Sequence, residues 1–325
     1  MLTDLPSADL HTYRSDQTEP ADFDEFWAGT LAEAAAHDID VRREPVRTGL
    51  TTIDTYDVTF RGYAGQEVRA WLRVPAGHQG PLPAVVQYVG YGGGRGHALA
   101  SLLWASAGFA HLHMDTRGQG AGWSVGETPD PAPAGPQVPG VMTRGIRNPA
   151  DYYYRRLTTD AVRAVDAARS LPEIDSGRIA VLGGSQGGGL ALAVAGLRDD
   201  LAAAVAFVPF LCDFPRATRI TDEYPYREIA DYLKTHRESV DQVHRTLAYF
   251  DGVNHARRAR ASALFSVALM DETCPPSTVY GAFHAYAGPR RILVWEYNGH
   301  EGGGILDEAR ALDFLREHLT PTATP

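Results

Sequence analysis

Short, continuous apolar runs alternate with amphipathic stretches along most of this chain. Apolar and β-branched runs predict buried strands at 84–89, 109–115, 178–182, 203–208, 263–268 and 291–297. Between them, apolar positions recur at helical spacing and predict helices at 20–37, 98–106, 153–171, 188–195, 277–285 and 307–318. This alternation indicates an α/β fold, in which a mostly parallel, doubly wound sheet carries helices on both faces.

Three regions depart from this rhythm. Apolar and polar positions alternate at 55–60 and 68–74, which predicts a β-hairpin in an N-terminal extension over about 1–80. Residues of about 215–258 are polar and helical in pattern, and this insert exceeds what a sheet crossover needs. A long loop rich in glycine and proline covers roughly 117–149. We expect one domain with this extension and this helical insert.

Composition limits the partners and the cellular compartment that we expect for the protein. The chain has 325 residues, of which 44% are hydrophobic, enough for a large core, and its net charge of -10 argues against a nucleic-acid partner. With only Cys212 and Cys274, a disulfide framework is not expected, and a reducing compartment fits. The first residues lack the basic and apolar segments of a secretory signal, and no apolar run is long enough to span a membrane. We therefore expect a cytoplasmic protein with no membrane partner.

The most informative motif is Gly183-Gly184-Ser185-Gln186-Gly187, which lies between the strand 178–182 and the next predicted helix. Strand, tight turn and helix around Gly-x-Ser-x-Gly form the nucleophile elbow of α/β-hydrolases. A β-carbon on either flanking glycine would collide with the neighbouring strand or helix. At the helix N-terminus, free N–H groups and the helix dipole favour the oxyanion that acyl transfer develops. An ordinary glycine-rich turn is the alternative, and the flanking elements argue against it.

A serine nucleophile needs a base and a third group that orients the base, in the chain order serine, acid, histidine. His300 directly follows the last predicted strand, where this fold requires its base. The competing histidines, which we rank lower, are His255, His284 and His318. Asp271 is the first carboxylate after the strand at 263–268, and the adjacent Glu272 remains a competitor on spacing alone.

An oxyanion hole requires two N–H donors. One is expected from the backbone of Gln186, and the other from the glycine-rich loop at 90–94 after the first buried strand. The loop lacks the Gly-Lys-Ser/Thr ending of a phosphate-binding loop, so nucleotide binding is disfavoured.

Three further residues offer alternative chemistry. His111 and His113 share one face of a strand, with Asp115 two residues on, so a metal pair is conceivable. We prefer the interpretation that both histidines are satisfied in the interior of the fold. For Cys274, beside the expected acid, we predict an inert, small hydrophobic side chain.

Three motifs together resemble carbohydrate esterase family seven, which contains acetyl xylan esterases and cephalosporin C deacetylases. They are Arg-Gly-Gln-Gly at 117–120, Gly-Ser-Gln-Gly-Gly at 184–188, and His300-Glu301. The resemblance covers nearly the whole chain, with further matches at 22–27, 62–66, 91–96, 152–156 and 274–278. His111 and His113 depart from the family, where apolar or aromatic residues are expected.

This resemblance implies site residues that spacing alone leaves open. It implies a triad of Ser185, Asp271 and His300, and it favours Asp271 over Glu272. It also implies that Tyr91 and Gln186 supply the oxyanion hole. The supporting residues that it implies are Arg117, Gln119 and Glu301.

The implied activity is a serine esterase that removes acetyl groups from small acetylated sugars, including acetylated xylo-oligosaccharides, and from cephalosporins. The resemblance further implies a homo-oligomer, a hexamer whose sites face an inner cavity, and no metal or cofactor is expected. Two other functions compete. One is a serine peptidase or amidase of the same fold, and the other is a non-enzymatic binding protein, which the intact Ser, Asp and His set argues against.

Overall fold

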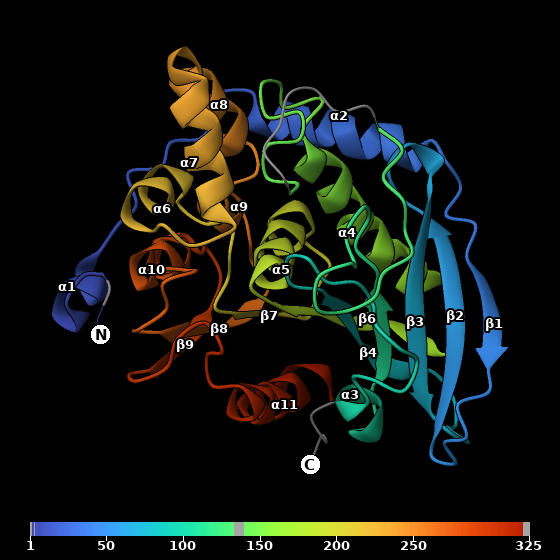
Figure 1. The fold of residues 1–325 in the computed structure, drawn as a ribbon. Coiled ribbons are helices and arrows are strands. Elements are labelled where there is room, and N and C mark those ends of the chain that lie inside the picture. The colour runs from blue at the N-terminus through green and yellow to red at the C-terminus, as the bar shows by residue number, and fades with distance from the viewer. Residues whose placement is uncertain (1, 3, 133–139, 321–325) are drawn as a thin grey trace.

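One nine-stranded sheet runs through the middle of the molecule (Figure 1). The computed structural model describes residues 2, 4–132 and 140–320. In these residues the strands are β1 (Arg42–Val46), β2 (Ile53–Arg61), β3 (Glu67–Pro75), β4 (Leu82–Tyr88), β5 (Ala110–Met114), β6 (Ile174–Gly184), β7 (Ala203–Phe207), β8 (Ser262–Ala268) and β9 (Arg290–Trp295). Their order across the sheet is β1-β2-β3-β5-β4-β6-β7-β8-β9.

The sheet is mostly parallel, as predicted. Strands β4 to β9 pair in parallel, whereas β1, β2 and β3 pair antiparallel with their neighbours. The predicted hairpin is formed by β2 and β3. Strand β1 was not predicted, because its side chains are largely exposed and Pro45 interrupts the strand pattern. Such features are typical of an edge strand, which needs no buried face.

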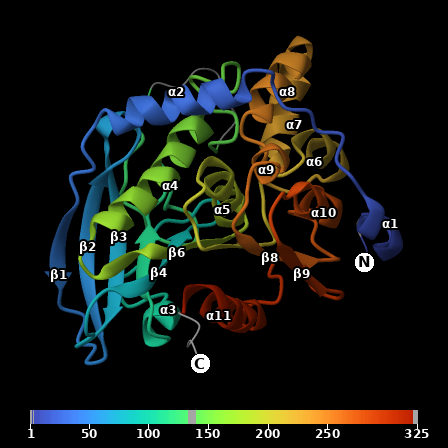
Figure 2. The same cartoon turned by 180° about the vertical axis from the view of Figure 1, so that it is seen from behind.

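Helices cover both faces of the sheet, so the predicted doubly wound architecture is confirmed (Figures 1 and 2). The helices are α1 (Ser7–Thr12), α2 (Phe23–Ala35), α3 (Leu103–Ser106), α4 (Tyr153–Ser170), α5 (Gln186–Leu197), α6 (Phe214–Ile220), α7 (Tyr226–Thr235), α8 (Val240–Ala248), α9 (Gly252–Ala256), α10 (Pro276–Ala285) and α11 (Ile305–Leu319). Helices α3 and α11 pack on one face through Trp104 and Phe314, which share a cluster with Val205 of β7. Helices α4 and α5 pack on the other face.

The helix predicted at 98–106 is wrong over most of its length, since only Leu103–Ser106 is helical. The backbone of Ser101 is left-handed, with φ 53°, and the buried Arg73 takes the carbonyl groups of His97 and Ala98 as acceptors. Those carbonyl groups are therefore engaged outside any helix. Helix α1 was not predicted, and it is only six residues long.

The predicted helical insert comprises α6 to α9, and α9 packs on α5, the helix that follows the turn with Ser185. The described parts of the loop at 117–149 contain no helix or strand, and the segment 133–139 lies outside the described residues. No helix in the described part of the chain has the length and apolar character needed to cross a membrane.

Candidate active site

Ser185 occupies a strained turn between β6 and α5. Its φ is 54° and its ψ is -121°, a region that residues with a side chain rarely adopt. Glycines are required on both sides of it. A Cβ on Gly183 would lie 2.3 Å from the carbonyl carbon of Gly187, and a Cβ on Gly187 would lie 2.3 Å from the carbonyl oxygen of Tyr88. The collisions expected from the sequence are therefore present.

The structure brings Ser185, His300 and Asp271 together. The Ser185 Oγ lies 3.0 Å from Nε2 of His300, and Nδ1 of His300 lies 2.9 Å from Oδ2 of Asp271. The other oxygen of this fully buried carboxylate accepts the backbone N–H groups of Thr273 and Cys274, each at 2.8 Å. These bonds hold the carboxylate plane against the imidazole. Glu272 is exposed, and Asp271 takes the position beside the histidine.

The carboxylate of Asp271 determines how His300 can act. A carboxylate next to Nδ1 favours the tautomer that carries its proton there. Nε2 then presents a lone pair to the hydroxyl of Ser185, which is the arrangement that a general base requires.

The loop with Tyr91 closes over the serine turn. A Cβ on Gly90 would lie only 4.0 Å from the Cβ of Ser185. Gln119 links this loop to the start of α5, because its Oε1 accepts the N–H of Gly92 at 2.6 Å and its Nε2 donates to Oε1 of Gln186 at 2.9 Å. One side chain thus braces both segments from which oxyanion donors are expected.

The helical insert also reaches this loop. The hydroxyl of Tyr91 donates to Oε1 of Glu228, on α7, at 2.6 Å and accepts the N–H of Val141 at 2.8 Å. The second oxygen of Glu228 accepts the N–H of Met142 at 3.0 Å. Burial raises the pKa of both Tyr91 and Glu228 above their ordinary values. Sequence reasoning missed Glu228, since nothing in the pattern of an amphipathic helix marks one glutamate as buried.

Arg117 lies beneath these loops and is fully buried. Its guanidinium makes a bidentate pair with Asp160 of α4, at 2.5 and 2.8 Å, and donates to Oε1 of Gln66 at 2.6 Å. Glu301 lies on the surface and accepts from the side chain of Asn298 at 2.9 Å. That hydrogen bond lowers the pKa of Glu301. The Arg117 contacts join distant segments beneath the site, whereas the Glu301 contact lies within the loop that carries His300.

Cys274 lies closer to the chemistry than expected. Cys274 is fully buried, and burial raises the pKa of its thiol. Within the described residues, Asp271, Cys274 and His300 also form a group whose candidate metal-ligand atoms lie within 4.8 Å of one another. Because the aspartate and the serine both engage the imidazole, we interpret the group as part of a serine hydrolase site.

His111 and His113 are buried, as predicted, and their rings stack with centroids 5.4 Å apart. The expectation that both are satisfied is wrong, because Nδ1 of His111 and Nδ1 of His113 each lack a hydrogen-bond partner in the described residues. Asp115 turns away from them, and its carboxylate accepts backbone N–H groups of Arg95 and Thr128. The lower-ranked histidines lie elsewhere: His255 packs on Trp27, His284 bonds to the Tyr13 carbonyl, and His318 stacks on Phe314.

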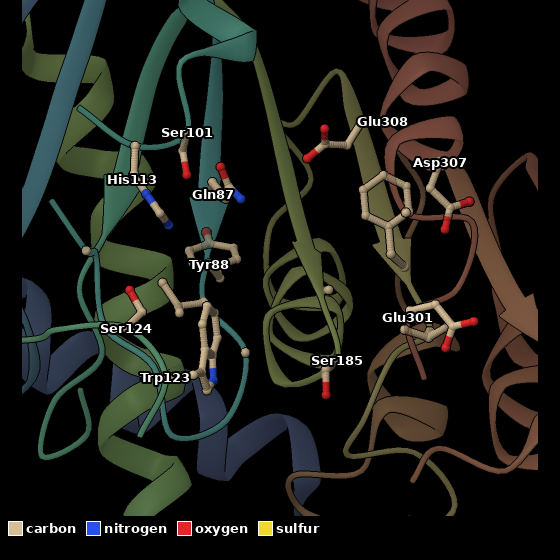
Figure 3. A pocket seen from close by; sticks show the side chains of 18 of the residues that line it. Gln87, Tyr88, Ser101, His113, Trp123, Ser124, Ser185, Glu301, Asp307 and Glu308 are labelled. Atoms are coloured by element: carbon tan, nitrogen blue, oxygen red, sulfur yellow. The ribbon is translucent and has the colours of Figure 1, made fainter. Parts of the chain in front are cut away.

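A cavity of about 640 Å³ opens at Ser185 and His300. It extends along the sheet face between the end of β4 and the start of α11 (Figure 3). Trp123, which is 68% exposed, lies at its rim and donates its Nε1–H to the carbonyl of Tyr91 at 2.8 Å. The site therefore combines a held serine with a space large enough for a substrate.

A strained serine after a central parallel strand, with its histidine and aspartate on later loops, defines an α/β-hydrolase. The family model described as acetyl xylan esterase (AXE1) matches residues 1–318. The chain belongs to this family of carboxylic ester hydrolases, and the resemblance inferred from its motifs is confirmed.

Individual relatives agree with this assignment. The chain is similar to an acetyl xylan esterase from Paenibacillus sp. R4, with 40% identity, a TM-score of 0.92, and coverage of 97% of this chain and 100% of that one. Acetyl xylan esterase 1 from Thermoanaerobacterium sp. is 31% identical, with a TM-score of 0.89. That match covers 98% of this chain and 100% of the other. A curated relative, acetyl esterase Axe7A from Xylanibacter ruminicola, is 30% identical over 284 residues, 86% of this chain. The chain spans 63% of the length of that relative.

Peptidases are related through the fold alone. The acylaminoacyl peptidase of Pyrococcus horikoshii superposes with a TM-score of 0.62 at 16% identity, and this chain covers 44% of it. Likeness at that level carries no argument for peptide cleavage.

Proposed function

We propose that this protein removes O-acetyl groups from small acetylated carbohydrates, above all acetylated xylo-oligosaccharides, and also from cephalosporin C. The observation that carries the proposal is the chain of contacts from Ser185 Oγ to His300 Nε2, at 3.0 Å, and from His300 Nδ1 to Asp271, at 2.9 Å. Membership of the acetyl xylan esterase family supports the acetyl ester as the bond that is cleaved.

In the first half of the reaction, Ser185 Oγ attacks the acetyl carbonyl carbon while its proton passes to Nε2 of His300. Asp271 stabilises the imidazolium that forms. The tetrahedral intermediate collapses, the bond to the alcohol breaks, and His300 returns the proton to the alcohol oxygen. An acetyl-enzyme and the free alcohol result.

In the second half, water attacks the acetyl carbon and gives its proton to His300. The intermediate collapses to acetate, and the proton returns to Ser185. In both halves, negative charge develops on the carbonyl oxygen. The backbone N–H groups of Tyr91 and Gln186 are the proposed donors to it, and the braces from Gln119 and Glu228 support their preorganisation.

A panel of substrates tests the proposal. We expect p-nitrophenyl acetate to be cleaved faster than the butyrate ester, and acetylated xylobiose and cephalosporin C to release acetate. A peptide p-nitroanilide should be inert. Cleavage of the anilide at a rate comparable to that of the acetate ester would favour the peptidase alternative, and inactivity on every ester would contradict the proposed function.

The proposal includes the assembly and the compartment. A homo-oligomer is supported by large apolar side chains at the rim of the cavity, where Trp123 is 68% and Ile305 is 70% exposed, and the proposed hexamer rests on the family resemblance. Exposed apolar groups gathered at one place favour association with another protein surface. A cytoplasmic location is supported by Cys212 and Cys274, which are buried free thiols.

A further inference from the structure

The cavity at the catalytic serine continues well beyond the reacting atoms. Gln87 of β4 lies beside Leu182 of β6, which precedes Ser185 by three residues. At the rise of a β-strand, the cavity wall at Gln87 is therefore about 10 Å from the serine along the sheet. An acetyl group is much shorter than this, so the far end of the cavity is available to the rest of the ester.

Polar side chains gather at that far end. Figure 3 shows Gln87, Ser101 and His113 together on one wall, and all three line the cavity. Nε2 of His111 lies 2.8 Å from Oε1 of Gln87. If this contact is read as a hydrogen bond from the ring N–H to the amide oxygen, it fixes the amide and leaves the NH₂ group of Gln87 free to donate to a ligand.

His113 is the less usual member of this wall. It is 6% exposed, it lines the cavity, and its Nδ1 has no partner in the described residues. This Nδ1 has almost no accessible surface, so a ligand hydroxyl group in the cavity would meet the ring at its exposed edge, which carries Nε2. Burial, together with the nearby Arg73 and Arg95, lowers the pKa of His113 to about 3. The ring is therefore neutral, and a neutral ring nitrogen suits a hydroxyl group, which can donate or accept, better than an ion.

The opposite wall supplies an acceptor. Glu308 of α11 lines the cavity, and in Figure 3 its carboxylate extends toward the space between the two walls. Burial raises its pKa, and the neighbouring Asp307 adds to the shift. A long acyl chain in this space would bury its carbons against unpaired polar atoms, which is unfavourable. A ring that carries several hydroxyl groups could instead pair with both walls.

We propose that the far end of the cavity is a subsite for the alcohol part of the ester, in which Gln87 and His113 hydrogen-bond the hydroxyl groups of one sugar ring. This inference rests on the proposed function, and it names the residues that select a polyhydroxylated leaving group.

Selectivity between two acetate esters tests the subsite. Gln87→Met and His113→Leu keep the approximate side-chain volume and remove the polar atoms. We expect each to lower kcat/KM for acetylated xylose, relative to that for p-nitrophenyl acetate, about fivefold to tenfold, the range of one lost hydrogen bond. Matched controls, Gln242→Met and His318→Leu, make the same exchanges outside the cavity. In these controls, the ratio of kcat/KM for acetylated xylose to kcat/KM for p-nitrophenyl acetate should stay within twofold of the wild-type value.

Inhibition of the wild-type protein supplies a second measurement that needs no variant. Xylose should inhibit hydrolysis of p-nitrophenyl acetate competitively, at a concentration at least fivefold below that required of tetrahydropyran, the same ring without hydroxyl groups. The subsite would be overturned if both cavity variants kept the wild-type ratio of kcat/KM for the two esters, with or without an equal loss on each. Stronger inhibition by tetrahydropyran than by xylose would also overturn it. A wild-type protein inactive on acetylated xylose but inhibited preferentially by xylose would contradict the proposed substrate and retain the subsite.

Discussion

The Nε2 atom of His300 lies 3.0 Å from Oγ of Ser185, although 115 positions separate the two residues in the sequence. The serine is fixed by the turn between β6 and α5, and the histidine by a loop after β9, which is three strands away from β6 in the sheet. Parallel strands present their carboxyl ends at one edge of the sheet, so both loops arrive at the same edge. The first prediction concerns this contact.

Ser185→Ala should abolish hydrolysis of acetate esters. Removal of the nucleophile of a serine hydrolase lowers kcat on the order of a million-fold. Alanine retains the Cβ that already tolerates φ 54°, so the fold should be preserved. Turnover of p-nitrophenyl acetate and the thermal midpoint measure the two effects. Substantial activity in a folded variant, or labelling of another residue by a covalent serine inhibitor, would contradict the assigned nucleophile.

Asp271→Asn should lower kcat far more than Glu272→Gln. An asparagine beside Nδ1 favours the wrong imidazole tautomer, at a cost of roughly ten-thousand-fold in the best-studied triad. Glu272 is exposed, and its neutralisation should change kcat less than about threefold. Steady-state kinetics on one acetate ester compares the two variants. Equal losses would show that the orienting carboxylate is wrongly assigned.

Site residues held by local structure could be predicted from the sequence, whereas those held by contacts with distant parts of the chain could not. Ser185 was identified from five consecutive residues, because a nucleophile elbow is a local structure with local steric demands. Asp271 and Glu272 could not be separated by spacing, and only the family resemblance favoured the first. Glu228 and Gln87 could not be found at all. Their positions depend on how a helix from the insert and a neighbouring histidine pack against them, which no local pattern records.

The same distinction between local pattern and distant contacts decides which strands and helices could be predicted. Continuous apolar runs predicted the central parallel strands, since their burial on both faces leaves a clear pattern. Strand β1 carries exposed side chains and gives no such pattern. The helix predicted at 98–106 failed because Arg73, on a distant strand, takes the carbonyl groups of His97 and Ala98. Tertiary hydrogen bonds there override helical spacing.

Tyr91→Phe should lower kcat with little change in KM. The phenol hydroxyl bridges Glu228 and the N–H of Val141, and it holds the loop whose backbone is the proposed oxyanion donor. A misplaced donor weakens the transition state more than the ground state. We expect a loss of about tenfold, below the 10²–10³-fold that removal of a whole donor costs. Glu228→Gln keeps an acceptor for the hydroxyl and should lose less. A change confined to KM would contradict this role.

The assembly proposal makes its own prediction. Light scattering should give about six times the monomer mass of 35.3 kDa. If an inner cavity limits access, acetylated xylobiose should be cleaved much faster than polymeric acetyl xylan at equal acetyl concentration. Ile305→Lys, at the exposed rim, should shift the mass toward the monomer, and Glu317→Gln on the far end of α11 should not. A wild-type protein that is monomeric and cleaves polymeric acetyl xylan as readily as acetylated xylobiose would contradict the proposed assembly.

The last prediction concerns stability toward acid. His255 is fully buried against Phe23 and Trp27, and burial, with Arg258 nearby, lowers its pKa to about 3. In the unfolded chain its pKa is about 6.5. The unfolded state therefore binds the proton first as the pH falls, so this histidine destabilises the fold progressively between about pH 6.5 and pH 3 and has no such effect above pH 7.

From pH 7.5 to pH 5, His255 alone should lower the free energy of unfolding by about 2 kcal/mol. In His255→Leu, which cannot take up a proton, the loss over the same interval should be smaller than in the wild type by that amount. Urea unfolding at both pH values measures it, and His37→Gln, at an exposed histidine, serves as the control. Equal acid sensitivity of the wild type and His255→Leu would show that the buried imidazole is not what acid protonates on unfolding.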